Sequence, residues 1–167
     1  MTNPITLRPA VPDDLPAIQD IYNDAVLTLA ATYDIEPQPL SARIRWYDDH
    51  REQGLPVVVA IDDGKVVGWG SLNRYNTRPG YRFTVENSIY IAPSHRGQGI
   101  GKMILAAQIA DARALGMHAI LAGIDSGAVA SLRLHESFGF EKVAHFKEIG
   151  QKFDHWLDVV YMELLLD

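Results

Sequence analysis

The residues with the clearest chemical use form a glycine-rich segment past the middle of the chain. In order, the segment contains Arg96, Gly97, Gln98, Gly99, Ile100, Gly101 and Lys102. Glycines at alternate positions before a helix let backbone N–H groups approach a phosphate without interference from Cβ atoms. The helix N-terminus adds unpaired N–H donors and the positive end of the helix dipole. The segment is therefore predicted to bind a phosphate group, with a ligand-free turn between strand and helix as the alternative.

Two common phosphate-binding motifs do not match this spacing. A dinucleotide-binding loop needs G-x-G-x-x-G after the first strand and an acidic residue about 20 positions later. Here the third glycine comes one position early, and the segment lies past mid-chain. A Walker loop needs G-x-x-x-x-G-K-[ST]. Gly101 and Lys102 supply its end, but Arg96 and Met103 stand where Gly and Ser or Thr are required.

A second candidate for anion binding precedes the glycine-rich segment. The chain carries a formal net charge of −6, yet Arg74, Arg78 and Arg82 lie close together in it. Guanidinium groups suit bidentate recognition of a carboxylate or a related anion, although solvated loop charges fit the same pattern. Because the chain as a whole is acidic, neither nucleic acid nor an anionic membrane is predicted as a partner.

Cysteine and histidine usage argues against a metal site. The chain has no cysteine, which excludes disulfides, a cysteine nucleophile and cysteine-based zinc sites. Most of the histidines lack the i, i+4 or similar spacing of metal ligands. These are His50, His95, His118, His145 and His155.

Length and composition predict one domain over residues 1–167. A chain of 167 residues with 47% hydrophobic and 22% charged residues is typical of a globular domain with its own core. It has no apolar run of about 18 residues, the length that a membrane-spanning helix needs. Residues 1–4 lack the basic and apolar regions of a signal peptide. We therefore expect a cytoplasmic protein.

The elements that must position the glycine-rich segment can be predicted from apolar periodicity. Strands are expected at residues 5–8, 57–61, 66–69, 84–91, 119–124, 141–149 and 156–165. Helices are expected at residues 15–26, at 41–54 with Ser41 as the cap, from the glycine-rich segment to Leu115, and at 128–138. A strand-helix-strand unit in the second half favours one parallel pair, and the hairpins are antiparallel. The predicted fold is α/β, with a mixed, mostly antiparallel sheet and helices on both faces.

The chain resembles the GNAT superfamily of N-acetyltransferases. The signature R-x-x-G-x-G is matched by Arg96, Gly99 and Gly101, after an apolar strand and before a helix. Residues 134–140 match the later helix and strand entry of the superfamily, and landmarks of the phosphinothricin and methionine sulfoximine N-acetyltransferase branch occur at residues 21–25, 84–91, 133–136, 151–153 and 156–158. The resemblance implies the GNAT acyl-CoA N-acyltransferase fold, acetyl-CoA-dependent N-acetyltransferase activity and a homodimer.

The resemblance also implies where acetyl-CoA binds. Its pyrophosphate is expected at residues 96–102, and no metal is required. Its pantetheine amides are expected to pair with Ile89, Tyr90 and Ile91 as an added strand would. A backbone N–H of the same strand is the expected donor to the oxygen of the tetrahedral intermediate.

One position departs from the pattern of the branch. Ala128 stands where the branch often has an Asn that contacts the cofactor. One hydrogen bond to acetyl-CoA is therefore either missing or supplied by Ser126 or Ser131.

Two side chains are candidates for proton transfer. An amine with a pKa of roughly 8 to 10 is mostly protonated at pH 7 and must lose a proton before it can attack a thioester. Glu86, in the strand before the glycine-rich segment, matches the general base of the branch. His135 stands where many members of the superfamily place a tyrosine that protonates the departing thiolate, and an imidazole can act as such a donor. A solvent-facing glutamate and a structural histidine are the alternatives.

The acceptor is expected to be a small, anionic, amino-acid-like amine such as phosphinothricin, methionine sulfoximine or methionine sulfone. Direct attack by its α-amino group in a ternary complex is the expected reaction. Arg78 and Tyr81 match substrate-binding positions of the branch, and Tyr33 is a candidate pocket wall. Asn87 and Ser88, beside the proposed base, are also expected to contact the acceptor.

Two other functions stay open on the sequence. The chain can be a non-catalytic sensor domain that binds acyl-CoA, or it can acetylate another amine such as a protein N-terminus, a polyamine or an aminoglycoside. Polycationic acceptors favour an acidic pocket, whereas Arg74, Arg78 and Arg82 would bring positive charge.

Overall fold

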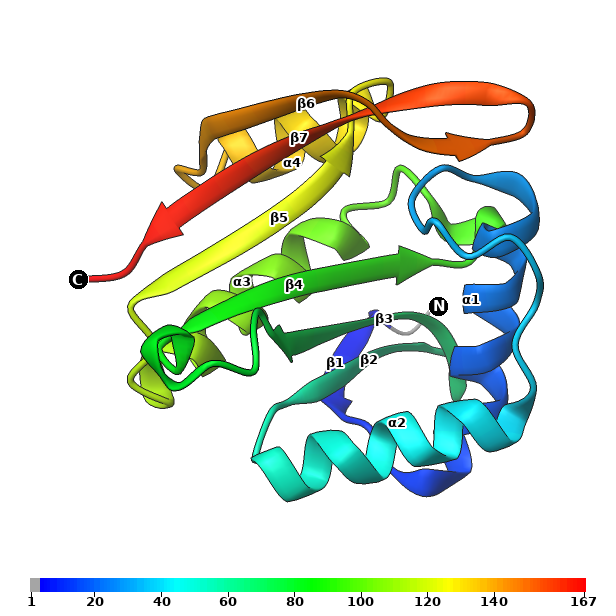
Figure 1. Cartoon of the computed structure of the whole chain (residues 1–167). Helices are drawn as coiled ribbons and strands as arrows, with labels where there is room; N and C mark the ends of the chain where they lie inside the picture. Colours follow the sequence, from blue (N-terminus) through cyan, green and yellow to red (C-terminus); the bar gives the residue numbers. More distant parts are fainter. Residues whose placement is uncertain (1–3) are drawn as a thin grey trace.

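A seven-stranded sheet runs through the middle of the molecule (Figure 1). The computed structural model describes residues 4–167, so the part of the signal-peptide argument that falls on residues 1–3 lies outside the described residues. In spatial order the strands are β1 (Thr6–Pro9), β2 (Val57–Asp62), β3 (Lys65–Arg74), β4 (Thr84–Ile91), β5 (Ala119–Asp125), β7 (His155–Leu165) and β6 (Glu141–Lys152). Neighbouring strands are antiparallel except β4 and β5, which run parallel.

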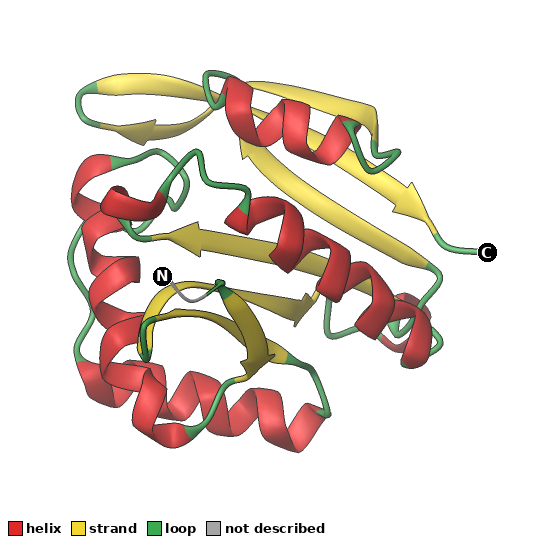
Figure 2. Cartoon of the chain, turned by 180° about the vertical axis from the view of Figure 1, so that it is seen from behind, coloured by secondary structure: helices red, strands yellow, loops and turns green. Residues whose placement is uncertain are grey.

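Two pairs of helices cover opposite faces of the sheet (Figures 1 and 2). One face carries α1 (Leu15–Thr28) and α2 (Leu40–Gln53), and the other carries α3 (Ile100–Ala114) and α4 (Val129–Glu136). Short 3-10 helices η1 (Pro12–Asp14), η2 (Pro79–Tyr81) and η3 (Pro93–His95) lie in the connections. The predicted mixed sheet and its single parallel pair are confirmed. No helix in residues 4–167 has the length and apolar character needed to cross a membrane.

Helix α3 approaches the sheet closely because β3 contains glycine beneath it. A Cβ atom at Gly70 would lie 2.5 Å from Ile104 Cγ2 and 2.6 Å from Gln108 Nε2. The side chains of Ile104 and Gln108, both buried, therefore pack directly against the backbone of β3. The prediction that this strand ends at residue 69 is wrong, since β3 continues to Arg74 and pairs with both β2 and β4. The glycine that interrupts the apolar pattern makes room for the helix.

The start of α2 also differs from the prediction. The helix begins at Leu40, its N-cap residue is Pro39, and no side chain caps it, so the assignment of Ser41 as the cap is wrong. The buried Tyr47 holds this helix instead, because it packs in one core cluster with residues of β2 and β3 and donates a hydrogen bond to the main-chain oxygen of Ala10, just after β1. The predicted end at Gly54 is confirmed, with the left-handed φ of 68° that suits glycine.

The parallel strands β4 and β5 pair over only part of their length. Thr84–Glu86 pairs with Ala119–Leu121, and the register goes no further. β5 remains paired with β7 to its end, and Figure 1 shows β4 and β5 diverging toward their C-terminal ends. The backbone of β4 from Asn87 to Ile91 therefore has no strand partner on the side of β5.

Candidate functional site

A cleft of about 580 Å³ opens where β4 and β5 separate. Its walls come from both strands, α4, the loop after α1, and the hairpin of β6 and β7. Of the residues predicted from the sequence, the cleft is lined by Tyr33, Glu86, Asn87, Ser88, Ile89, Tyr90, Ser131 and His135. Four other predicted groups do not line it, namely Arg78, Tyr81, Ile91 and residues 96–102. The structure thus brings together most of the predicted catalytic and acceptor-binding residues.

The unpaired edge of β4 can hold a ligand that contains amide groups. Along Asn87–Ile91 the strand pairs with β3 on one side only. An exposed strand edge presents N–H and C=O groups that an extended, amide-bearing chain can pair with. Ile89 and Tyr90 lie on the cleft wall at this edge.

The glycine-rich segment forms the N-terminus of α3. Gly97 and Gly99 have φ of 73° and 84°, which is the left-handed region that favours glycine. Gly99 is the N-cap residue, and no side chain caps the helix. A Cβ atom at either glycine would meet nothing within 4 Å. The loop therefore presents uncapped N–H groups of a helix N-terminus to open space, as an anion-binding loop requires.

Ile100 and Arg96 of this segment hold the loop in place. Ile100 is buried in the core, and a Cβ atom at Gly101 would lie 3.1 Å from Leu134 Cδ2 of α4. Arg96 Nε donates to Ile91 O at 3.2 Å, and its Nη2 lies 3.4 Å from a carboxylate oxygen of Asp24. Lys102 and Gln98 are exposed. Contacts of Ile100 and Gly101 with a ligand are accordingly limited to their main chain.

Glu86 lies at the point where the two strands begin to separate. Its side chain is half-buried, and burial raises the pKa of its carboxyl group. Within residues 4–167 its main-chain oxygen accepts a hydrogen bond from Asn73 Nδ2 at 3.0 Å, whereas its carboxylate accepts none. Burial and the charge of this carboxylate raise the pKa of Tyr161 across the cleft. The carboxylate is therefore free to accept a proton from a ligand.

Small residues on the neighbouring strands make room around Glu86. A Cβ atom at Gly123 of β5 would lie 3.3 Å from Glu86 Oε1 and 3.3 Å from the ring of Tyr161. At Gly150 of β6, a Cβ atom would lie 2.8 Å from Cε1 of Tyr33. The ring of Tyr33 thus lies against the backbone of the hairpin and closes one side of the cleft.

A buried lysine ties the hairpin to the loop that carries Tyr33. Lys152, only 3% exposed, donates from Nζ to Leu29 O at 2.7 Å and to Thr32 O at 2.8 Å. These bonds satisfy two carbonyl groups after the end of α1. Lys152 therefore links the two segments that form this wall, the loop that carries Tyr33 and the strand that carries Gly150.

His135 lies at the buried end of α4, on the wall of the cleft. Its Nδ1 is 2.8 Å from Ser131 O, and its Nε2 is 3.0 Å from Asn87 Nδ2. Burial lowers the pKa of the ring, and the hydrogen bond to Ser131 offsets this only in part. A ring with a lowered pKa is neutral at neutral pH and is a weak proton donor.

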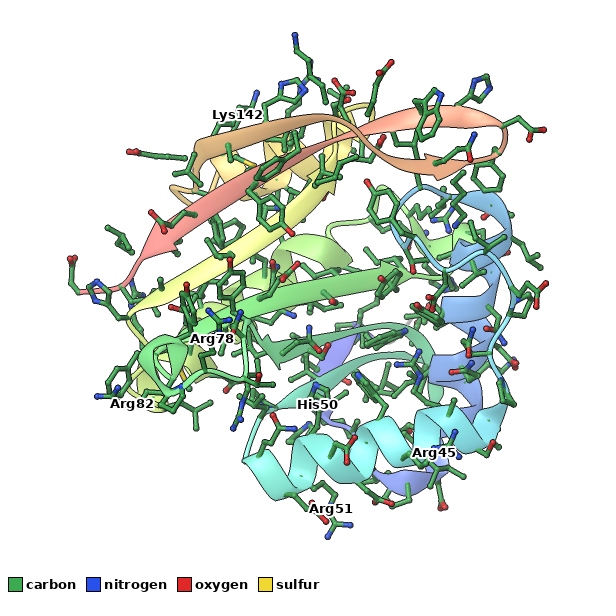
Figure 3. All side chains as sticks on the ribbon, in the orientation of Figure 1. Arg45, His50, Arg51, Arg78, Arg82 and Lys142 are labelled. Carbon is green, nitrogen blue, oxygen red and sulfur yellow. The ribbon has the colours of Figure 1, made fainter. Side chains whose placement is uncertain are left out.

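Arg78 and Tyr81 lie in the segment between β3 and β4. Figure 3 shows Arg78 and Arg82 near the start of β4, at the opposite end of that strand from the glycine-rich segment. Both arginines are exposed, and Tyr81 packs edge to face on Tyr75 with ring centroids 5.4 Å apart. Their contact with an acceptor stays a prediction.

The sequence did not single out several residues of the cleft. Tyr161, Gly123, Ile149 and Gly150 line it, and they come from β5, β6 and β7. A glycine within a strand often marks a close backbone approach, so Gly123 and Gly150 carried a weak signal. The position of Tyr161 carried none, because it depends on how β7 pairs with β5.

The sequence profile of the acetyltransferase (GNAT) family matches residues 17–140 of the chain. The chain is 40% identical over 163 residues to an L-methionine sulfoximine/L-methionine sulfone acetyltransferase of Salmonella typhimurium, covering 98% of this chain and 95% of that protein. It is 34% identical over 165 residues to a phosphinothricin N-acetyltransferase of Streptomyces coelicolor, covering 97% of this chain and 96% of that protein.

A solved structure has nearly the same fold. It is a phosphinothricin acetyltransferase of the GNAT superfamily from Sinorhizobium meliloti, in complex with acetyl-CoA. The two chains superpose with a TM-score of 0.95 at 37% sequence identity, covering 97% of this chain and 88% of that one.

Proposed function

The chain belongs to the acetyltransferase (GNAT) family, and on that premise we propose that it moves the acetyl group of acetyl-CoA to the α-amino group of a small, amino-acid-like acceptor. The amine attacks directly while both substrates are bound. The observation that carries this function is the position of Glu86. Its carboxylate, with no hydrogen bond of its own within the described residues, lies where the two strands open into the cleft.

The residues present fit acetyl-CoA, which supplies the acetyl group as a thioester. The N-terminus of α3, with Gly97 and Gly99 in left-handed conformation, suits the pyrophosphate. The unpaired edge of β4 at Ile89 and Tyr90 suits the pantetheine amides. Ser131, on the cleft wall near the start of α4, is the proposed side-chain donor in place of the Asn that Ala128 replaces.

Glu86 is the proposed general base. Because burial raises its pKa, the carboxylate is a stronger base than an exposed glutamate and accepts a proton from an ammonium group more readily. The half-buried site also limits competition from water. Proton removal leaves the amine with the lone pair that attack requires.

The acceptor is proposed to lie between Glu86 and the wall formed by Tyr33 and Gly150. The names of the relatives support an acceptor of amino-acid type, since methionine sulfoximine, methionine sulfone and phosphinothricin all carry an α-amino group beside a carboxylate. Asn87 and Ser88 line the same part of the cleft. Arg78 and Tyr81 are proposed to interact with an anionic acceptor from the exposed segment before β4.

An acceptor screen tests this function. Purified protein with acetyl-CoA is assayed for release of the CoA thiol in the presence of methionine sulfoximine, methionine sulfone, phosphinothricin, other L-amino acids and the polyamine spermidine. We expect the amino-acid analogues to stimulate release and spermidine to have no effect. If spermidine is the better acceptor, the proposed acceptor class is wrong. If no amine stimulates release while acetyl-CoA binds, the chain is a sensor of acyl-CoA instead.

We further propose a homodimer in which β6 and β7 contribute to the contact. Their hairpin exposes Phe146, Ile149, Phe153 and Trp156, which are between 46% and 62% exposed. Exposed aromatic and aliphatic side chains gathered on one element are typical of a protein interface. Light scattering on the purified protein measures the mass, and replacement of Trp156 by Ser is expected to weaken the dimer.

A further inference from the structure

A buried glutamine on α3 has a fixed orientation. Gln108 is 1% exposed, and its Nε2 donates to Ser71 O at 3.1 Å and to Ser88 O at 2.9 Å. Both partners are carbonyl oxygens, which only accept. The amide nitrogen must therefore face β3 and β4, and Oε1 of Gln108 must face the opposite way. The missing side chain at Gly70 makes this approach possible.

This orientation fixes the next amide, that of Asn87. Its Nδ2 donates to Gln108 Oε1 at 3.2 Å, so its nitrogen end is turned toward α3 and α4. The same Nδ2 lies 3.0 Å from His135 Nε2. Since an amide nitrogen only donates, His135 has to accept at Nε2 and carry its proton on Nδ1. That proton is donated to Ser131 O at 2.8 Å.

This orientation of the Asn87 amide leaves its oxygen atom without a hydrogen bond. Asn87 Oδ1 is buried and has no hydrogen-bond partner within residues 4–167. A buried acceptor without a partner is unfavourable, and turning the amide would place this oxygen beside His135 instead. Gln108 opposes that turn, because its own oxygen would then face the oxygen of Asn87.

A second histidine on the other face of the sheet provides a contrast. His50 of α2 also places Nδ1 beside the main-chain oxygen four residues earlier, that of Trp46, at 2.8 Å. Its Nε2 lies 3.0 Å from the oxygen of Asn73. The nitrogen of Asn73 is occupied by Glu86 O and Ser88 Oγ. His50 therefore faces an acceptor oxygen at each ring nitrogen, whereas His135 faces an oxygen at Nδ1 and an N–H donor at Nε2, because the neighbouring asparagine is turned the other way.

We propose that Gln108 is a positioning residue: through Asn87 it holds His135 in the neutral tautomer with the proton on Nδ1, so that Nε2 has no proton to give to the departing sulfur. The relevance of this tautomer to turnover rests on the proposed acetyltransferase function, whereas the tautomer itself does not. Gln108 thereby keeps positive charge away from a cleft that has to receive an ammonium group.

Long-range ¹H–¹⁵N correlation spectra of the histidine rings test the proposal without any substrate. In the parent protein at neutral pH, His135 is expected to show a protonated Nδ1 and an unprotonated Nε2. In Gln108→Met, which removes the amide, Asn87 is free to turn, and a large share of the His135 proton is expected on Nε2.

Two controls separate this effect from general damage to the core. The signals of His50, on the other face of the sheet, should be the same in Gln108→Met as in the parent protein. Gln19→Met removes a buried glutamine of α1 that bonds to Arg43 and does not touch His135, so it should leave the His135 spectrum unaltered. A protonated Nε2 in the parent protein, or an unchanged tautomer in folded Gln108→Met, would overturn the proposal. Failure to acetylate any amine would contradict the proposed function and leave the tautomer measurement intact.

Discussion

The two ends of the proposed substrate-binding site are built from different parts of the chain. The end assigned to acetyl-CoA consists mainly of main chain, from the edge of β4 and the N-terminus of α3, two segments that are close in sequence. The end assigned to the acceptor consists of side chains such as Tyr33, Glu86 and Tyr161, which come from three distant segments.

This difference predicts that the two ends respond separately to substitution. Main-chain hydrogen bonds tolerate most side chains, so the cofactor end should be sensitive only where backbone conformation is special, as at Gly99. The acceptor end should be sensitive to single side chains. Relatives with the same cofactor can then differ in acceptor through changes at the acceptor end alone.

The largest effect is expected from Glu86→Gln. Loss of a general base typically lowers the rate about 10²- to 10⁴-fold, so kcat should fall by that order while the Kd for acetyl-CoA is unchanged. An assay of CoA-thiol release measures kcat, and calorimetric titration with acetyl-CoA measures the Kd. Undiminished turnover would show that Glu86 is not the general base. It would also contradict the prediction that the acceptor end depends on single side chains.

The stability of Glu86→Gln serves as its control. Because burial raises the pKa of Glu86, the folded state disfavours the ionised carboxylate relative to the unfolded chain. The neutral glutamine removes that cost at pH 7, so the melting temperature should be equal or higher. A lower melting temperature would mean that the lost activity reflects unfolding.

The pH dependence of the parent protein gives a further sign. Activity should rise as Glu86 ionises, with the midpoint of this limb above the ordinary value of 4.5 because the pKa is raised. Profiles of kcat/KM for the parent protein and Glu86→Gln can be compared directly. The acidic limb of the profile should be absent in Glu86→Gln. If both proteins show this limb with the same midpoint, it reports the ionisation of another group.

A smaller effect, confined to the cofactor end, is expected from Gly99→Ala. Its φ of 84° disfavours any residue with a Cβ atom, at a cost of about 1–3 kcal/mol. Because a Cβ atom there would meet nothing within 4 Å, the cost is conformational, and KM for acetyl-CoA should rise about tenfold. The KM for the acceptor should stay within twofold of the parent value, and an equal rise in both would show that the ends are coupled.

Gly150→Ala is the matched change at the acceptor end. The new Cβ atom would lie 2.8 Å from Tyr33 Cε1, and the partly exposed ring can move aside at small cost in stability. We expect the acceptor KM to rise several-fold and the acetyl-CoA KM to stay the same. Unaltered acceptor kinetics would place the acceptor away from Tyr33.

The smallest effect is expected from Ala128→Asn. Ala128 is the N-cap residue of α4 and has no side-chain cap. An asparagine there should stabilise the helix by about 0.5–2 kcal/mol and, as part of the cleft wall, lower the KM for acetyl-CoA. Thermal unfolding measures the first effect. A stabilised variant with an unchanged KM would mean that this position does not contact the cofactor.

The sequence by itself determined the strand at Thr84–Ile91, the position of Glu86 within that strand, and the helix that follows the glycine-rich segment. These features rest on apolar periodicity and on glycines at fixed spacing, which are local properties of the chain. Gln108 was not singled out from the sequence, although it lies at helical spacing between Ile104 and Ala112 on the buried face of α3. Its partners could not be predicted, because Asn87 and Ser71 meet it only when the helix lies on the sheet.

Only the tertiary structure decided the acceptor end and the protonation of the site. The contact between Tyr33 and Gly150 joins residues more than a hundred positions apart, and it depends on the pairing of β6 with β7 and on the bonds of Lys152. The tautomer of His135 depends on which end of Asn87 faces it. That choice follows from hydrogen bonds made across three elements, and no spacing along the chain encodes it.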